Sequence, residues 1–166
     1  IEAGYSNAQP WQEIQWLENT CHLPFRSIAF IDITQEQSDF SDDLNQLKLF
    51  RSIIGVRYIF DEPEIINLLN QRNIIDNLKS IAEHNMVFEL QMPLSNTKAV
   101  DAFCNILNKC PQLHVAINHA GFPPRDKSLK DWEHALTKLS QYQNVIIKCS
   151  GWEMIDREYD DKWITE

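Results

Sequence analysis

Five short runs of hydrophobic residues are spaced along the chain and separated by stretches with helical periodicity. The runs are rich in Ile, Val and Phe and have the length of strands that are buried on both faces. Their centres lie about 26 to 32 residues apart, which is the length of one strand followed by one helix. The runs are Ser27–Ile33, Ile53–Phe60, Met86–Met92, His114–His119 and Val145–Ser150.

The stretches between these runs carry helix signals. Apolar residues at helical spacing predict helices after Pro10 and around 44–50, 65–69, 74–82, 100–107 and 132–139, with a last one starting near 152. Pro10 fits a first helical turn, Asn85 fits the left-handed residue beyond a helix end, and Ser95 or Asn96 fits an N-cap. Strands that alternate with helices predict a parallel α/β sheet, and we expect residues 1–166 to form one domain.

Composition and charge narrow the range of partners. The chain has 15 Lys and Arg against 24 Asp and Glu, a net charge of −9, so nucleic acid and anionic membranes are poor partners. No apolar run is long enough to cross a bilayer, and the start of the chain lacks the pattern of a secretory signal. The four cysteines form no CxxC pair, and we expect free thiols in a reducing cytoplasm.

Polar residues follow every predicted strand. In parallel α/β folds the chemistry lies at the carboxyl ends of the strands. The residues found there are Asp32, Arg57, Glu89 with Gln91, Asn118 with His119, and Lys148 with Ser150, and Glu2 would end a sixth run. One ionisable residue at a strand end usually belongs to a structural ion pair. Five such ends together favour a ligand-binding or catalytic pocket.

The alternation of side chains along a strand predicts which face each of these residues occupies. Arg57 should lie opposite Val56 and Tyr58, and Glu89 should point away from its neighbours Phe88 and Leu90. By the same rule His119 should share a face with Val115 and Ile117, and Lys148 with Ile146.

Three of these side chains suggest specific chemistry. His119, where the chain leaves a strand, suits a metal ligand or a general acid and base. Arg57 suits a carboxylate that it would bind through two hydrogen bonds. Lys148 suits an oxyanion or an ion pair with Glu89.

Five short segments also occur in an order and at a spacing that resemble a known family. They are Ile1–Ala3, Ile54–Arg57, Val87–Leu90, Ile117–Pro123 and Ile147–Gly151. These resemble the patterns VEA, GVR, FDL, DHxGxP and KxSG of the amidohydrolase-2 group of the amidohydrolase superfamily. The resemblance implies a metal-dependent hydrolase on a (β/α)8 TIM barrel, in a group that includes sugar-lactone and pyrone-dicarboxylate lactonases.

The departures from the family pattern are as informative. The HxH pair of the family's first strand and the GSDWP-like run of its eighth have no counterpart here, so the resemblance implies an incomplete barrel, about strands two to seven. On its own this piece would be inactive and would expose open sheet edges near Ile1–Ala3 and Val145–Ser150. It would then either self-associate through these edges or be marginally stable. Two family aspartates are replaced, by Glu89 and by Asn118.

The resemblance also implies roles for single residues. His119, Lys148 and Glu89 would be catalytic, Arg57, Gln91 and Ser150 would bind substrate, and Glu2 and His119 would hold a divalent metal, zinc or manganese, in the full-length protein. The substrate would be a lactone or a small carboxylate. The alternative is a non-catalytic relative that binds a small acid or a protein partner through the same pocket.

Overall fold

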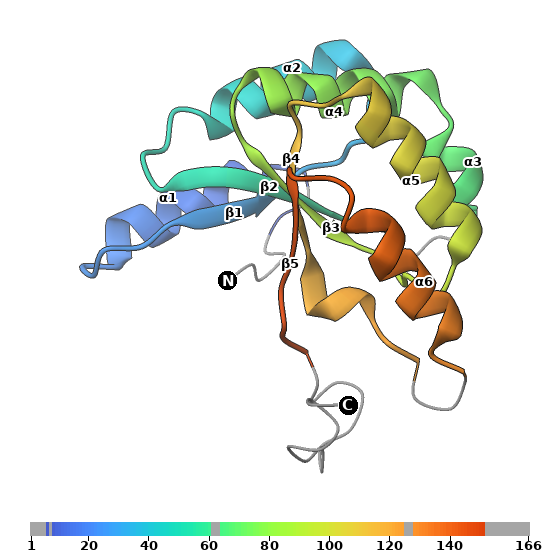
Figure 1. Cartoon of the computed structure of the whole chain (residues 1–166). Helices are drawn as coiled ribbons and strands as arrows, with labels where there is room; N and C mark the ends of the chain where they lie inside the picture. The colour runs from blue at the N-terminus through green and yellow to red at the C-terminus, as the bar shows by residue number, and fades with distance from the viewer. Residues whose placement is uncertain (1–5, 7, 61–63, 125–127, 152–166) are drawn as a thin grey trace.

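The structure of the chain is a computed structural model that describes residues 6, 8–60, 64–124 and 128–151. Within this part, five parallel strands form one sheet in the order β1-β2-β3-β4-β5 (Figure 1). The strands are β1 (Ser27–Phe30), β2 (Ile53–Ile59), β3 (Val87–Gln91), β4 (His114–Ile117) and β5 (Val145–Ile147). The predicted parallel α/β sheet is confirmed. The sixth run that would contain Glu2 lies outside the described residues.

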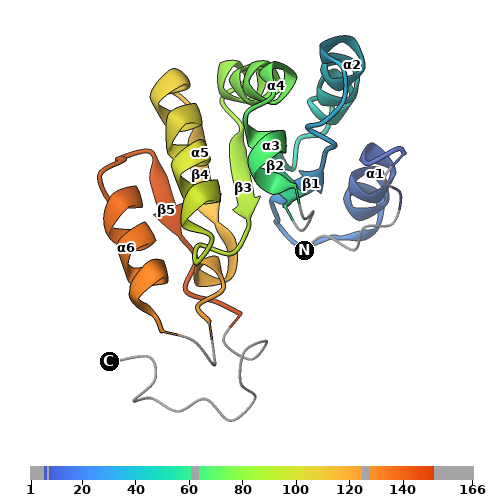
Figure 2. The same cartoon turned by 90° about the vertical axis from the view of Figure 1, so that its right-hand side faces the viewer.

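One helix precedes β1, the others lie between successive strands, and together they form an arc along one side of the sheet (Figure 2). They are α1 (Trp11–Thr20), α2 (Gln37–Leu47), α3 (Ile65–Leu69), α4 (Arg72–Glu83), α5 (Thr97–Lys109) and α6 (Lys130–Leu139). Two predicted end signals are confirmed, because Asn85 has a φ of 54° and the Asn96 side chain accepts a hydrogen bond from the Ala99 amide at 3.2 Å. The helix expected from residue 152 lies outside the described part.

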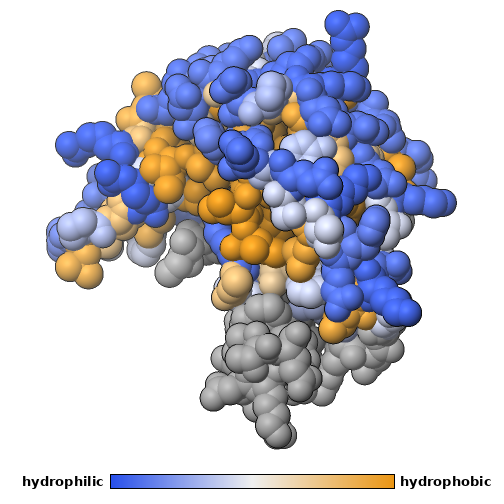
Figure 3. Space-filling model, in the orientation of Figure 1, coloured by the Kyte–Doolittle hydropathy of each residue, from blue (hydrophilic) through white to orange (hydrophobic). Residues whose placement is uncertain are grey.

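The hydrophobic core lies between the sheet and this arc of helices. Val56 and Tyr58 on β2 and Phe60 just after it are buried in the core, whereas Ile59 on the opposite face is 37% exposed. The alternation predicted for β2 is therefore confirmed, and Arg57 lies on the face that the helices leave open. Figure 3 shows hydrophobic side chains gathered in the middle of the face in view. The exposed large hydrophobic residues include Ile59 and Ile146.

All five strands end earlier than their hydrophobic runs predict, β2 and β3 by one residue and the other three by two or three residues. β1 ends at Phe30, β4 at Ile117 and β5 at Ile147. After β4 the chain enters a 3-10 turn, η1 (Asn118–Gly121), and His119 adopts a φ of 52°. The prediction that His119 shares a strand face with Val115 and Ile117 is therefore wrong, since side-chain alternation ends where the extended backbone ends.

Both outer strands of the sheet have a single strand neighbour among the described residues. β1 pairs with β2, and β5 pairs with β4. Ile146 and Ile147 on β5 are 64% and 37% exposed. The edge predicted at Ile1–Ala3 lies outside the described residues, and self-association through the open edges stays a prediction. No described helix is both long and apolar enough to cross a membrane.

Candidate functional site

The register of the sheet brings charged residues from three strands together. β2 and β3 pair so that Arg57 lies directly beside Glu89, and the neighbour of Glu89 on β4 is the small Ala116. Asn118 follows two residues after Ala116, where the chain leaves β4. Lys148 follows directly after β5. The carboxyl ends of β2 to β5 thus supply one cluster, as parallel strands require.

Glu89 is the centre of this cluster. Its Oε2 accepts hydrogen bonds from Arg57 Nε at 2.9 Å, from Arg57 Nη2 at 2.5 Å and from Asn118 Nδ2 at 3.1 Å. Its Oε1 accepts one from Lys148 Nζ. Asn118 Nδ2 also lies 3.5 Å from Gln91 Oε1. The Glu89 side chain is only 4% exposed, whereas those of Arg57 and Lys148 are 20% and 39% exposed.

These donors fix the charge of Glu89. Burial by itself would raise the pKa of Glu89, but the hydrogen bonds from Lys148, Arg57 and Asn118 outweigh it and hold the pKa below its ordinary value. A carboxylate that has a low pKa and already accepts four hydrogen bonds is a weak proton acceptor. Its geometry instead suits an anchor that holds one guanidinium and one ammonium group in place, with parts of both exposed.

The turn that carries His119 has an unusual backbone. His119, Ala120, Gly121 and Phe122 have φ values of 52°, 49°, 70° and 53°, all in the left-handed region. This conformation costs about 1–2 kcal/mol for each residue with a Cβ, so the surroundings must hold it. The Ala120 amide donates to the Lys148 carbonyl at 2.9 Å, and the Leu94 amide donates to the Gly121 carbonyl at 2.9 Å.

Two glycines make room for this turn. A Cβ on Gly121 would lie 2.2 Å from Leu94 Cγ. A Cβ on Gly151, which has a φ of 82°, would lie 2.5 Å from Nδ1 of His119. The His119 ring also lies 5.4 Å from the Phe122 ring, and Nδ1 is buried with no hydrogen-bond partner among the described residues. The ring is thus held in place, and no described group pairs with this nitrogen.

Lys148 connects the two parts of the site. Its ammonium group binds Glu89, and its carbonyl accepts the hydrogen bond from the Ala120 amide. Within the described residues no hydrogen bond joins the His119 side chain to the Glu89 cluster. The two lie at the same edge of the sheet and share Lys148 as a neighbour.

Not every predicted residue joins this arrangement. Asp32 accepts hydrogen bonds from the amide and hydroxyl of Thr34, at 2.9 and 2.6 Å, within its own loop. Ser150 is exposed, and its amide donates to the Lys148 carbonyl at 2.9 Å. Glu2 lies outside the described residues. The side chains of Arg57, Glu89, Asn118, Gln91 and Lys148 do come together.

Sequence patterns did not single out three residues that shape the site: Gly121, Gly151 and Trp132. Trp132 Nε1 donates to the Ala120 carbonyl at 2.8 Å. The two glycines follow His119 and Ser150 closely in the chain, and an isolated glycine beside a candidate site residue is the signal that could have found them.

The described residues do not form a complete metal site. No group of three or more His, Cys, Asp or Glu side chains comes together within the ranges that the structure covers. His119, with its unpaired Nδ1, is a single candidate ligand, and Glu89 is held by two cations that would repel a metal ion.

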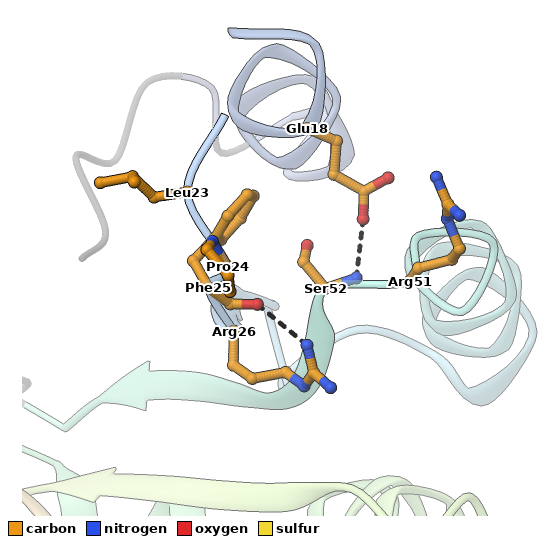
Figure 4. A pocket seen from close by; sticks show the side chains of 7 residues that line it. All are labelled: Glu18, Leu23, Pro24, Phe25, Arg26, Arg51 and Ser52. Carbon is orange, nitrogen blue, oxygen red and sulfur yellow. Dashed lines mark hydrogen bonds between the residues drawn. The ribbon is translucent and has the colours of Figure 1, made fainter. Parts of the chain in front are cut away.

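A cavity of about 330 Å³ lies at the opposite end of the strands from the Glu89 cluster (Figure 4). It is lined by Glu18, Leu23, Pro24, Phe25, Arg26, Arg51 and Ser52. Ser52 precedes β2, so the cavity lies at the amino ends of the strands. Glu18 Oε1 accepts from the Ser52 amide at 2.7 Å, and Arg26 donates to the Phe25 carbonyl at 3.0 Å. These contacts fix loops and lie away from the Glu89 cluster.

Comparison with solved structures shows the fold. An amidohydrolase from Burkholderia multivorans, solved with bound zinc, is 17% identical and superimposes with a TM-score of 0.73 over 93% of this chain and 54% of that one. Amidohydrolase 2 from Bifidobacterium longum subsp. infantis is 19% identical, with a TM-score of 0.58 over 87% of this chain and 51% of that one. The chain thus spans about half the length of these structures, which fits an incomplete barrel.

Comparison with protein families shows the relationship. No curated protein sequence matches the chain. The family model for amidohydrolases matches residues 53–165, which include Arg57, Glu89, His119 and Lys148. Because this match covers well over half of the sequence, the chain belongs to the amidohydrolase family.

Proposed function

We propose that the chain contributes part of the active site of a hydrolase that opens a lactone or related cyclic ester with an anionic group. The observation that carries this proposal is the Glu89 cluster, in which one buried carboxylate fixes two partly exposed cations at the carboxyl edge of a parallel sheet. Cations held in fixed positions stabilise negative charge better than mobile ones, because no reorganisation is needed during the reaction.

The two cations have separate roles in this proposal. Arg57 binds the carboxylate of the substrate, since a guanidinium offers paired donors. Lys148 faces the scissile carbonyl and stabilises the oxyanion. Gln91 and Ser150 contact the remaining polar groups of the substrate. Glu89 holds both cations and takes no proton, which its low pKa supports.

The proposed reaction is the hydrolysis of the ring ester. A water oxygen attacks the carbonyl carbon, and the π electrons move to the carbonyl oxygen, which Lys148 stabilises. His119 takes a proton from the attacking water. When the C–O bond of the ring breaks, His119 returns this proton to the leaving alkoxide oxygen. The C=O bond re-forms as the C–O bond breaks, and the products are a free hydroxyl and a carboxylic acid, which releases its proton to the solvent and becomes a carboxylate.

As an alternative to the role of His119 as the base, a divalent metal, zinc or manganese, is proposed for the full-length protein, with Glu2 and His119 among its ligands. The similar structure from Burkholderia multivorans holds zinc, which supports this proposal. The described residues offer His119 alone and do not fit a complete metal site. The steps proposed above therefore use only side chains of this chain.

Turnover of lactones tests the proposal. The natively expressed protein should hydrolyse at least one member of a panel of sugar lactones and 2-pyrone-4,6-dicarboxylate. His119→Asn should lower kcat by roughly 100-fold or more, the usual loss for a general acid and base. His134→Asn is the matched control, because His134 is exposed on α6. Turnover that survives His119→Asn would remove His119 from the reaction.

A further inference from the structure

Trp132 lies in the first turn of α6, away from the strands, yet it contacts the turn that carries His119. Its indole Nε1–H donates a hydrogen bond of 2.8 Å to the carbonyl of Ala120. We infer that Trp132 is a positioning residue that fixes the His119 ring through this bond. The inference rests on the proposed function in one respect, namely that the orientation of His119 matters for the reaction.

The turn needs such support. Four successive residues from His119 to Phe122 have positive φ, and three of them carry a Cβ, for which this conformation is unfavourable. Short left-handed stretches persist only where their surroundings hold them. Ala120 is 3% exposed, so its carbonyl is shielded from water, and the Trp132 indole supplies a hydrogen bond.

The bond from Trp132 fixes the backbone next to His119 from one side. Ala120 is held at both of its polar groups, with its amide on the Lys148 carbonyl and its carbonyl on the Trp132 indole. With both groups held, the peptide units on either side of Ala120 cannot rotate freely. The direction in which the His119 side chain leaves the backbone is fixed with them.

The ring itself is confined by close neighbours. Phe122 lies at 5.4 Å between ring centres, and Gly151 lies so close that a Cβ there would be 2.5 Å from Nδ1. A small rotation of the backbone at Ala120 would therefore push the ring against Gly151 or open a gap beside Phe122. Loss of the Trp132 hydrogen bond should therefore change the surroundings of the His119 ring.

Packing alone does not explain a tryptophan at this position. Trp132 is partly buried against the core, where the ring of a phenylalanine would also pack. The indole N–H is the feature that a phenylalanine lacks, and it points at a backbone carbonyl inside the candidate site. Trp132→Phe removes this donor and keeps an aromatic ring.

The orientation of His119 can be followed by NMR without any substrate. Histidine ring signals are recorded in the natively expressed protein labelled with 15N-histidine, and those of His119 are identified by their loss in His119→Asn. In Trp132→Phe we expect the His119 ring signals to shift beyond their line width or to broaden, while those of the other histidines stay in place. The matched control is Trp11→Phe, because Trp11 lies on α1 at the far side of the same core. This variant should shift none of the histidine ring signals.

Unchanged His119 signals in folded Trp132→Phe would overturn the inference. If that variant fails to fold, exchange of the Trp132 indole proton in the unchanged protein decides instead. We expect slow exchange, and exchange as fast as that of Trp16, which is 62% exposed, would overturn the inference.

Kinetics connect this result to the proposed function. Once a lactone that the protein hydrolyses has been found, kcat and KM can be measured with it. Trp132→Phe should lower kcat about tenfold and leave KM unchanged, because it displaces His119 and not Arg57. If His119→Asn keeps full turnover, the proposed function fails, while the NMR experiment still decides whether Trp132 orients His119.

Discussion

The amino ends and the carboxyl ends of the strands hold charged residues in different ways. We call these two ends of the sheet its amino edge and its carboxyl edge. At the amino edge, Glu18 lies on a helix and its carboxylate accepts a hydrogen bond from the Ser52 amide, beside two arginines that are exposed. At the carboxyl edge, Glu89 lies within a strand, is 4% exposed and binds both Arg57 and Lys148. One carboxylate secures a loop, and the other arranges two cations.

Both carboxylates have a lowered pKa, but for different reasons. The backbone hydrogen bond from Ser52 is the largest cause for Glu18. For Glu89, burial opposes ionisation, and the hydrogen bonds from Lys148, Arg57 and Asn118 overcome it. A lowered pKa alone therefore does not identify a functional carboxylate. The distinguishing feature is burial combined with cations that remain partly exposed.

The largest expected effect comes from removing the buried charge. Glu89→Gln should lower the free energy of unfolding by roughly 3 kcal/mol, toward the lower end of the range for broken buried pairs because both cations are partly exposed. Glu18→Gln at the amino edge should cost less than about 1 kcal/mol. Urea denaturation of both variants measures the difference. Equal losses would show that the two edges are held alike.

The next effect concerns ligand binding. Arg57→Ala should weaken binding of a carboxylate ligand by about 1.5–3 kcal/mol, the scale of losing a hydrogen bond to a charged group. Calorimetry measures this loss in the natively expressed protein, with the ring-opened carboxylate product of a lactone that the protein hydrolyses as the ligand. Arg51→Ala, which changes an arginine at the amino edge, should leave the affinity unchanged. If both variants bind normally, Arg57 does not contact the ligand.

The smallest effect concerns pH. Because the pKa of Glu89 is lowered on folding, the unfolded chain binds more protons in acid, and stability rises with pH in that range. The contribution of Glu89 is fully present above the ordinary glutamate pKa of 4.5 and is lost as pH falls through the lowered value. Stability measured from about pH 6 to about pH 3 should therefore decrease less in Glu89→Gln than in the unchanged protein. Identical slopes would contradict this linkage.

Much of the fold follows from local patterns. The five hydrophobic runs predicted the five strands because the strands of a parallel sheet are built mainly of apolar residues. The prediction that they are buried on both faces differs from the described structure, in which Ile59 and Ile146 are exposed on the face that the helices leave open. Asn85 and Asn96 predicted two helix ends because side-chain and backbone preferences there are local. The placement of Arg57 and Glu89 on the open face follows from simple alternation along β2 and β3.

The cluster around Glu89 was predictable only in part. The sequence indicated that charges gather at the carboxyl ends of parallel strands, and it offered an ion pair between Lys148 and Glu89 as one alternative. It did not indicate that Arg57 and Lys148 would share one carboxylate. That arrangement depends on the register of β2 and β3 and on the path of the chain after β5.

The sequence by itself determined the alternation of strands and helices, the charged edge of the sheet and the resemblance to amidohydrolases, because these depend on residue order and local preference. The tertiary structure decided where His119 points. Its left-handed turn is unfavourable on local grounds and exists because Leu94, Lys148 and Trp132 hold it from three separate segments. Local sequence patterns do not predict contacts between segments that are distant along the chain. The orientation of the candidate catalytic residue is therefore set only when the chain folds.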